Sequence, residues 1–269
     1  MTKKIIQLVA DKLNVPKNEL FISKFHHGTG TLGSKVLFLV SHKGKMLCIV
    51  KVLRDASFND KLKKEKISQE QFKPSKDFLS PQVYFDGYVD GYYVYGEQVF
   101  LGRTLPVNLA YKKEEEITQM IGNFPVKGEI SSLQVVKVFS DNMPEEETEG
   151  KELIKKIENK DIIFKKGFSH GDFTRKNIME EGEKLVLIDW ERAGDRPFLF
   201  IDAIHFMVSL RNVKTFEEWE KEILPLFVKY SNLNIDTSNG LYCIETIFEI
   251  FCKKYSDKYQ KVIKEILLL

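Results

Sequence analysis

Two short stretches decide the fold of this chain: SHGDFTRKNIM at residues 169–179 and LVLIDWERAG at residues 185–194. The first places Asp172 and Asn177 five positions apart, so one short loop can carry both a proton acceptor and a metal ligand. The second places Asp189 at the end of an apolar run, after the hairpin turn EEGEK. Phosphoryl transfer needs a carboxylate beside the acceptor hydroxyl and hard oxygen ligands for magnesium. The pattern predicts a site of this kind.

The segment HGDFTRKN resembles the catalytic loop of the aminoglycoside phosphotransferase and choline kinase superfamily, the small-molecule branch of the kinase-like fold. IDWE resembles the metal-binding motif of that superfamily, with Trp190 and Glu191 in place of the Phe-Gly of protein kinases. The resemblance implies that Asp172 is the catalytic base and that Asn177 and Asp189 are magnesium ligands. Two unrelated Asp-containing turns are the alternative, which the order and spacing of the motifs disfavour.

Two further residues support the catalytic loop in this resemblance. His170 would be a structural member of the loop, and Asp202 would accept hydrogen bonds from the loop backbone. Asp202 lies in the apolar segment RPFLFIDAIHF, where a carboxylate needs hydrogen-bond donors. A simple helix N-cap explains Asp202 equally well.

The segment FHHGTGTLGSKVLFLV contains three glycines at the spacing GxGxxG: Gly28, Gly30 and Gly33. This spacing alone fits a dinucleotide-binding turn, a kinase glycine-rich loop or an ordinary turn. A dinucleotide fold requires a helix directly after the glycines, whereas the residues that follow here are typical of a strand. A Walker loop is excluded because Gly33 is followed by Ser-Lys rather than Lys-Ser. The context favours a loop that folds over nucleotide phosphates.

Lys51 interrupts the apolar pattern CIVKVL, and lysine is seldom buried without a partner. Its place after the glycines predicts the lysine that binds the α- and β-phosphates, although an edge-strand lysine that reaches water would give the same pattern. The expected partner is a carboxylate on the following helix. We choose Glu65 because its distance before Pro81 suits the family's helix, with Glu70 as the competitor.

The segment VYGEQVFLGRTL is the candidate hinge, where kinase-like folds bind adenine through backbone groups. We expect these contacts at Glu97 and Val99, with Gly96 at the back of the adenine site. An ordinary strand-to-loop exit is the alternative, and the register can differ by one or two residues.

The catalytic loop also departs from its relatives. Arg175 and Lys176 stand where many relatives carry proline or another small residue, and Thr174 stands where protein kinases have lysine. Either basic residue can neutralise charge on the γ-phosphate or be a solvated loop charge. No activation segment ending in Ala-Pro-Glu follows Asp189, which argues against a protein substrate.

Hydrophobic periodicity predicts an α+β chain of two lobes, and the resemblance implies that these lobes form a two-lobed, protein-kinase-like fold. Residues 1–98 read as an amphipathic helix, a hairpin, a Lys-rich helix and a second hairpin broken by Gly87 and Gly91, which together form a nucleotide-binding lobe. Residues 99–269 read as a larger, mostly helical lobe that would carry catalysis and substrate binding. The resemblance implies that ATP and magnesium bind between the two lobes.

The composition limits the classes of binding partner and the cellular compartment that the chain fits. A formal net charge of +2 implies neither nucleic acid nor an anionic membrane surface. No apolar run is long enough to cross a bilayer, and the three cysteines lack metal-ligand spacing. A reducing cytosol is therefore the expected compartment.

These observations predict a phosphotransferase that moves the γ-phosphate of ATP, or of GTP, to a hydroxyl group of a small molecule. An amino alcohol such as choline, a sugar and an aminoglycoside are all compatible acceptors. A non-catalytic kinase-like nucleotide-binding or regulatory protein is the main alternative, which the complete set of Lys51, Asp172, Asn177 and Asp189 disfavours. A nucleotide-binding oxidoreductase is a second alternative, which the strand after the glycines disfavours.

Overall fold

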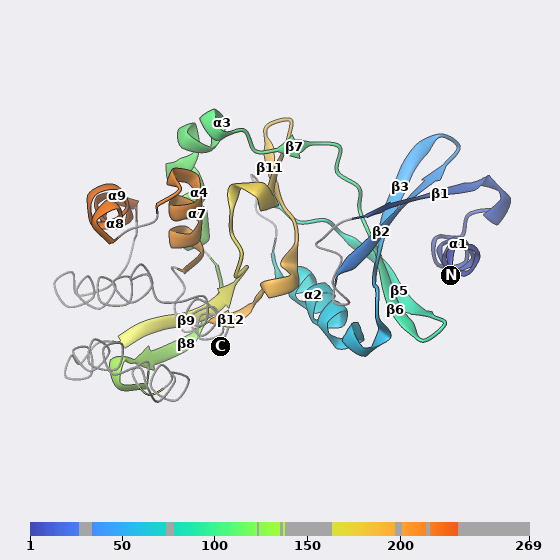
Figure 1. The fold of residues 1–269 in the computed structure, drawn as a ribbon, viewed down its shortest axis with the longest axis horizontal. Helices are drawn as coiled ribbons and strands as arrows, with labels where there is room; N and C mark the ends of the chain where they lie inside the picture. The colour runs from blue at the N-terminus through green and yellow to red at the C-terminus, as the bar shows by residue number, and fades with distance from the viewer. Residues whose placement is uncertain are drawn as a thin grey trace. The chain divides into compact units, whose positions relative to one another are not determined.

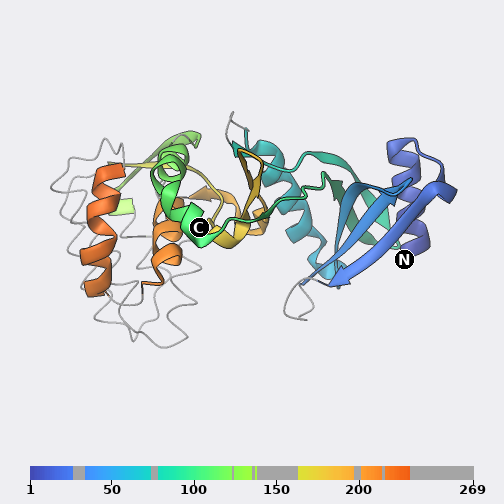
Figure 2. The same ribbon diagram turned by 90° about the horizontal axis from the view of Figure 1, so that it is seen from above.

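The computed structural model of the chain describes residues 1–26, 34–73, 78–122, 124–134, 137, 163–196, 201–213 and 216–230. The chain divides into two compact units, drawn as ribbons in Figures 1 and 2. Unit 1 is formed by Met1–Thr104 and Asn177–Glu191, and unit 2 by Leu105–Lys176 and Arg192–Leu269. The hairpin that leads to Asp189 is therefore part of unit 1, although the catalytic loop before it begins in unit 2.

Unit 1 begins with the predicted amphipathic helix, α1 (Thr2–Leu13). Ile5 and Val9, which lie about one turn apart, have no exposed surface and pack in the core beneath the sheet. The helix ends at Asn14, whose left-handed backbone allows its N–H to bond to the carbonyl of Ala10. A 3₁₀ turn at Lys17–Glu19 then leads into the first strand.

Five antiparallel strands form the sheet of unit 1, in the order β1-β2-β3-β6-β5. The strands are β1 (Leu20–His26), β2 (Lys35–His42), β3 (Lys45–Leu53), β5 (Val83–Val89) and β6 (Tyr92–Glu97). β2 and β3 form the first predicted hairpin, with Lys43 and Gly44 at positive φ in the turn. β5 and β6 form the second, and the turn between them contains Gly91. The prediction that Gly87 also breaks this run is wrong, because Gly87 pairs with Val94 inside β5.

Strand β3 is buried on both faces because each side of the sheet has a helix packed on it. Cys48, Val50 and Val52 belong to the core that includes residues of α1. Leu53 instead packs with Tyr93, Tyr95 and Leu62, the last of which lies on helix α2 (Asn59–Gln71). Since successive strand residues point to opposite faces, Lys51 shares the α2 face with Leu53.

The start of α2 is attached to the β5–β6 hairpin by the side chain of Asn59. Its amide nitrogen donates to the carbonyl of Gly91 at 2.8 Å, and its amide oxygen accepts from the N–H of Tyr93, also at 2.8 Å. A 3₁₀ turn at Ala56–Phe58, capped by the side chain of Asp55, precedes the helix. These contacts fix the α2 face of the sheet, on which the candidate site is built.

A second sheet completes unit 1, in the order β4-β11-β10-β7. Its strands are β4 (Phe78–Leu79), β7 (Arg103–Thr104), β10 (Ile178–Glu181) and β11 (Lys184–Leu187). β10 and β11 form the short hairpin predicted between the two motifs, with Gly182 at positive φ in its turn. Gly102 passes against the backbone of Glu180 so closely that any side chain there would overlap it. The hairpin is thereby held against the segment that follows β6.

Unit 2 contains five described helices and a three-stranded sheet of order β12-β9-β8. The helices are α3 (Val107–Lys112), α4 (Glu114–Gly122), α7 (Ile201–Arg211), α8 (Phe216–Glu222) and α9 (Leu224–Tyr230). The strands are β8 (Val126–Ser131), β9 (Ile163–Ser169) and β12 (Gly194–Arg196). Arg211 joins α7 to α4 through a two-pronged ion pair with Glu114. Unit 2 is thus mixed α+β, with more strand than its sequence predicts.

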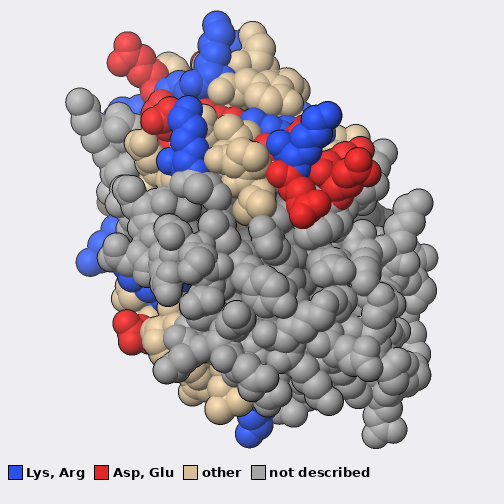
Figure 3. All heavy atoms as spheres, turned by 90° about the vertical axis from the view of Figure 1, so that its left-hand side faces the viewer, with Lys and Arg blue, Asp and Glu red and all other residues tan. Residues whose placement is uncertain are grey.

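Some predicted features fall outside the described residues: Gly28, Gly30 and Gly33, and parts of the mostly helical lobe predicted for residues 99–269. Among the helices that are described, none combines the length and the apolar character needed to cross a membrane. On the described residues visible in Figure 3, Lys and Arg side chains lie next to Asp and Glu side chains. This mixed surface agrees with the near-neutral charge of the whole chain.

Candidate nucleotide and metal site

Lys51 is the centre of a buried ionic cluster on the α2 face of the sheet. Its ammonium lies 3.0 Å from Oε1 of Glu65 on α2, and the two side chains are 7% and 1% exposed. Glu70 does not make this contact and pairs instead with Lys66 at 3.2 Å. The structure therefore selects Glu65 over Glu70 as the partner of Lys51.

Glu97 supplies a second carboxylate to the same lysine. Its Oε1 lies 2.9 Å from the Lys51 ammonium, and its Oε2 accepts from the amide of Gln69 at 2.9 Å. The sequence had given Glu97 only a backbone role. The register of β3 and β6 explains the side-chain contact, because Lys51 pairs with Tyr95 and Glu97 lies two residues further along the same face.

Lys35, the first residue of β2, makes further contacts with carboxylates that were not predicted. In the β2–β3 ladder Lys35 lies opposite Leu53, so it is the diagonal neighbour of Lys51 on the α2 face. Its ammonium lies 3.2 Å from Oε2 of Glu65 and 3.4 Å from Oε2 of Glu191, and it also pairs with Asp189. Alternation along β2 places Lys35 and Leu37 on the same face, but it does not indicate which carboxylates lie on that face.

Asp189 follows β11 at a position where the backbone is forced out of its usual range. Its φ is 67°, which non-glycine residues rarely adopt except in tight turns and functional sites. The next residue, Trp190, is fully buried, donates to the carbonyl of Leu187 at 3.2 Å and stacks at a tilt on Phe72. This anchor holds the IDWE segment against the rest of unit 1.

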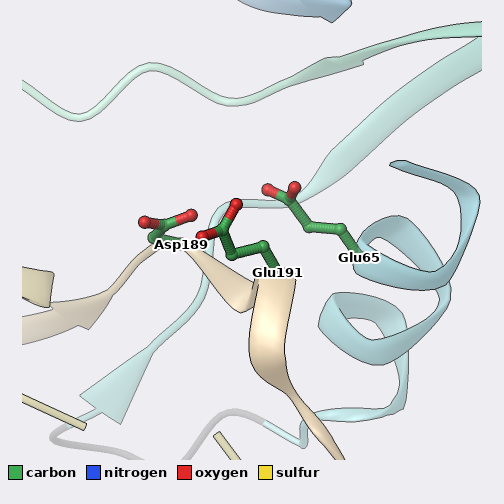
Figure 4. Close-up of side chains that lie close together, drawn as sticks. All are labelled: Glu65, Asp189 and Glu191. Atoms are coloured by element: carbon green, nitrogen blue, oxygen red, sulfur yellow. The ribbon is translucent and has the colours of Figure 1, made fainter. Parts of the chain in front are cut away.

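The carboxylates of Glu65, Asp189 and Glu191 converge, as Figure 4 shows. One oxygen from each lies within 4.8 Å of the others, a spacing that allows three ligands to share one cation. Carboxylate oxygens are the donors that magnesium prefers, so the set fits this ion chemically. Glu65 comes from α2, whereas Asp189 and Glu191 follow β11, so two separate elements contribute to the group.

Asn177 lies at the same end of the β10–β11 hairpin as Asp189. The N–H of Ile188 donates to the carbonyl of Asn177 at 3.0 Å, which extends the ladder one step beyond the Ile178–Leu187 pair. The two predicted magnesium ligands are therefore carried by adjacent ends of one hairpin. The roles of Asn177 and Asp189 as magnesium ligands stay a prediction.

The cluster contains two lysines, Lys51 and Lys35, and four carboxylates, and Lys61 contacts one of these carboxylates, Glu191, from the exposed side. When all of these groups are ionised, the carboxylates exceed the lysines by one charge. Burial lowers the pKa of Lys51, but the carboxylates of Glu65 and Glu97 more than offset this and raise it above the usual value. Burial likewise opposes ionisation of Glu65, yet Lys51 and Lys35 hold its pKa below the usual value. For Glu97 burial prevails and its pKa is raised. A divalent cation would compensate the negative excess.

The segment predicted to be the catalytic loop, in unit 2, is held in a different way. Asp202 at the start of α7 accepts hydrogen bonds from the N–H of His170 at 2.6 Å and from that of Gly171 at 2.9 Å. This confirms the expected role of Asp202. Gly171 has a φ of 75° and passes so close to the carbonyl of Arg192 that any side chain would overlap it. These features fix the backbone immediately before Asp172.

Aromatic packing supports the other side of Asp172. Phe173 is fully buried, with its ring 6.2 Å from that of Phe124 and 6.1 Å from that of Phe206, both edge-on. Arg175 donates to the carbonyl of Leu105 at 2.8 Å and so anchors the loop, whereas Lys176 is exposed. Of the two basic residues, Arg175 has a structural contact that its sequence context did not predict.

Comparison with known proteins rests on structure, because neither a protein-family model nor a curated protein matches the sequence. An aminoglycoside phosphotransferase in ternary complex with ADP and hygromycin B superposes with a TM-score of 0.57 at 12% identity, covering 98% of this chain and 95% of that one. The chain therefore shares the fold of this aminoglycoside phosphotransferase. The expected α+β, kinase-like fold is thereby confirmed.

Other members of this fold group match over the same extent. A macrolide 2′-phosphotransferase from Brachybacterium faecium gives a TM-score of 0.53 at 10% identity and covers 98% of both chains. The GDP complex of an aminoglycoside 2′-phosphotransferase variant gives 0.51 at 13% identity, covering 98% of this chain and 94% of that one. The fold is thus that of ATP- and GTP-dependent small-molecule kinases. At these identities the likeness extends to the fold alone.

Proposed function

We propose that this protein transfers the γ-phosphate of ATP or GTP to a hydroxyl group of a small molecule. In this proposal Asp172 is the catalytic base, which orients the acceptor hydroxyl and takes its proton. Lys51, held by Glu65, binds the α- and β-phosphates, and the segment with Gly28, Gly30 and Gly33 covers them. We retain residues 1–98 as the nucleotide-binding lobe and residues 99–269 as the catalytic and substrate-binding lobe.

The observation that carries the proposal is the ionic cluster of unit 1. A lysine buried in a central strand costs stability unless carboxylates compensate it, and two are devoted to Lys51. Next to this pair, Asp189 is held in a left-handed conformation that brings its carboxylate toward Glu65. A purely structural role would not need the negative excess of this cluster, whereas a site for magnesium and a nucleotide does.

Magnesium would be held by Asp189 and Asn177, with its charge neutralising the nucleotide phosphates. The adenine or guanine base would bond to backbone groups at Glu97 and Val99, directly after β6. Glu97 would then serve twice, since its side chain also fixes Lys51.

For the acceptor, we propose a small hydroxylated molecule in the cytosol: an amino alcohol, a sugar derivative or an aminoglycoside. Related folds include enzymes crystallised with hygromycin B, which illustrates the size of ligand that this architecture can accept. The decisive experiment is a coupled assay of ADP release across amino alcohols, sugars, nucleosides and aminoglycosides. Absence of acceptor-dependent ADP release, combined with nucleotide binding, would favour the non-catalytic alternative.

Binding of the nucleotide can be tested before any acceptor is known. ATP with magnesium should raise the melting temperature, and NAD should not. At a hundredfold excess of ligand over Kd, binding to the folded state adds about 2.7 kcal/mol to the free energy of unfolding. Asp189→Ala should abolish the magnesium-dependent part of this effect, because ligation needs an oxygen there. Asp60→Ala is the matched control, since the Asp60 side chain is 93% exposed and contacts only Lys63 among the described ion pairs.

A further inference from the structure

The three converging carboxylates of Glu65, Asp189 and Glu191 already surround a positive charge, the ammonium of Lys35. It donates to both oxygens of Glu65, at 3.3 and 3.2 Å, and pairs with Asp189 and Glu191. The Lys35 side chain is only 14% exposed. The ammonium therefore lies among the same carboxylates that could share one cation.

A magnesium ion and this ammonium exclude each other at the shared carboxylates. Magnesium needs its oxygen ligands at about 2.0–2.1 Å in a near-octahedral shell. An ammonium that bonds to Asp189, Glu65 and Glu191 occupies the space between them and uses lone pairs that would face the ion. The two cations also repel each other, so a metal ion that binds to Asp189 competes with the Lys35 ammonium for this carboxylate.

Lys35 is better suited to move than Lys51. Lys51 lies within β3, is 7% exposed and has Glu97 as a second buried partner that the metal group does not use. Lys35 is the first residue of β2 and directly follows the segment that contains the three predicted phosphate-binding glycines. A lysine at the end of a strand, with a flexible four-carbon side chain, can redirect its charge without disturbing the ladder.

We propose that Lys35 is the resident counter-ion of the metal site, which a divalent ion displaces when the nucleotide binds. This inference rests on the proposed function, because the nucleotide phosphates would receive the displaced ammonium. A buried ammonium that loses its carboxylates needs another anion, and a metal ion alone does not supply one. The metal ion by itself must therefore compete with Lys35, whereas the metal–nucleotide pair need not.

The consequence is a built-in coupling between metal and nucleotide. The apparent affinity for a metal ion alone is reduced by the small fraction of molecules whose site is free of Lys35. Removal of the lysine charge should raise that fraction toward one. Couplings of this kind change affinity by about 5–150-fold, which sets the size of the expected effect.

The test measures binding of Mn²⁺ alone, by electron paramagnetic resonance, to nucleotide-free protein. Lys35→Met and Lys35→Gln should each bind Mn²⁺ at least about fivefold more tightly than the wild type. Lys35→Arg keeps the positive charge, so its affinity for Mn²⁺ should stay close to that of the wild type. Lys61→Met is the matched control, because Lys61 also contacts Glu191, at 3.3 Å, but is 44% exposed and lies outside the group. It should change the affinity less than twofold.

A second measurement uses the wild type and does not depend on folding of the variants. Saturating Mn²⁺ alone should increase acetylation of Lys35 by an amine-reactive reagent, as read by mass spectrometry, while Lys51 stays protected. The proposal is overturned if the Lys35→Met and Lys35→Gln variants bind Mn²⁺ like the wild type, or if Lys35 stays equally protected once Mn²⁺ is bound. Either result would leave the proposed function intact if the wild type binds ADP with Mn²⁺. Loss of that binding as well would instead remove the proposed function.

Discussion

The ionic cluster of unit 1 and the catalytic loop of unit 2 are stabilised by opposite means. The cluster brings two lysines and four carboxylates together, and the lysines share them: Glu65 bonds to both Lys51 and Lys35. The loop is fixed by backbone hydrogen bonds to Asp202, by a glycine that tolerates no side chain and by edge-on aromatic rings. One region is built from charges that can exchange partners, and the other from contacts that cannot.

This difference suits the two tasks proposed for them. Nucleotide and metal carry large charges, so their site must exchange one set of ion pairs for another when they bind. A catalytic base must instead be in position before the acceptor arrives, because a misplacement of about 1 Å can cost about a hundredfold in rate. The comparison predicts that substitutions in the cluster change binding and stability, whereas substitutions in the loop change turnover.

The largest effect is expected for Asp172→Asn. This substitution keeps the shape of the side chain but removes the proton acceptor, and a general base contributes about 10²–10⁴-fold to rate. Turnover of the acceptor found in the ADP-release screen should fall at least about a hundredfold, with little change in ADP affinity. Steady-state kinetics and calorimetric titration of the purified variant measure the two quantities.

Asp195→Asn is the matched control for Asp172, since Asp195 is 46% exposed and pairs with Lys127 at the surface. Its turnover should stay within about twofold of the wild type, as expected for a surface ion pair. Near-normal turnover in Asp172→Asn would remove the assignment of the base. Loss of both ADP binding and the fold would point to a structural role for Asp172.

The next effect is expected for Lys51→Met in the cluster. Removing one partner of a buried ion pair costs about 3–5 kcal/mol, because Glu65 and Glu97 would be left without their shared cation. The unfolding midpoint in urea should fall accordingly, and ADP binding should be lost. Lys66→Met is the control: Lys66 lies on α2 next to Glu65 and pairs with carboxylates that are 46% and 43% exposed. If Lys51→Met lowers the free energy of unfolding no more than the control does, Lys51 does not stabilise the buried carboxylates as expected.

The sequence predicted the parts of both regions that depend on local pattern. The opening helix, the β2–β3 hairpin, α2 and the β10–β11 hairpin follow from periodicity and turn residues, and the Lys51–Glu65 pair from its place after the glycines. The contacts of Lys35 and Glu97 were missed because they depend on strand register. A lysine at the start of a strand gives no local sign of which carboxylates lie across the sheet.

The same limit explains the strands that were not predicted. β4 and β7 have two residues each and are defined by pairing with the β10–β11 hairpin, about a hundred and about seventy-five positions away in sequence. β12 is equally dependent on its partner, since its three residues pair with the end of β9. Such elements have too few residues to show a period of their own. Long-range pairing, rather than local propensity, creates them.

A smaller effect is expected for Asp202→Asn, at the start of α7, which holds the loop backbone. The carboxylate accepts from two backbone N–H groups, and an amide can present only one oxygen to them, so one buried donor loses its partner. Such a loss costs about 1–3 kcal/mol. Turnover should fall with an unchanged KM for ATP, because Asp202 acts only by positioning the loop. A change in KM with unaltered turnover would contradict the division of tasks between the two regions.

The smallest effect concerns His205 on α7, whose pKa is lowered. Burial lowers the pKa of His205 below its usual 6.5, and the nearby carboxylates of Asp202 and Asp172 offset this only in part. As the pH falls below about 6.5, the unfolded chain takes up the proton first, so the native state loses stability until the lower native pKa is reached. Each unit of pKa shift contributes about 1.4 kcal/mol. The melting temperature should therefore decline between pH 6.5 and 5 in the wild type and decline less in His205→Gln.

Two further variants sharpen this pH test. In Asp172→Asn a carboxylate that favours the charged imidazole is gone, so the pKa of His205 should fall further and the decline should extend to lower pH. His42→Gln is the control, because His42 contacts Glu19 at 2.7 Å and belongs to unit 1, whereas His205 and Asp172 belong to unit 2. Glu65, whose native pKa is depressed below 4.5, loses its contribution only at more acidic pH, so the two regions separate on the pH axis. An equal decline in the wild type and in His205→Gln would assign the pH dependence to other groups and leave the rigid description of the loop without this support.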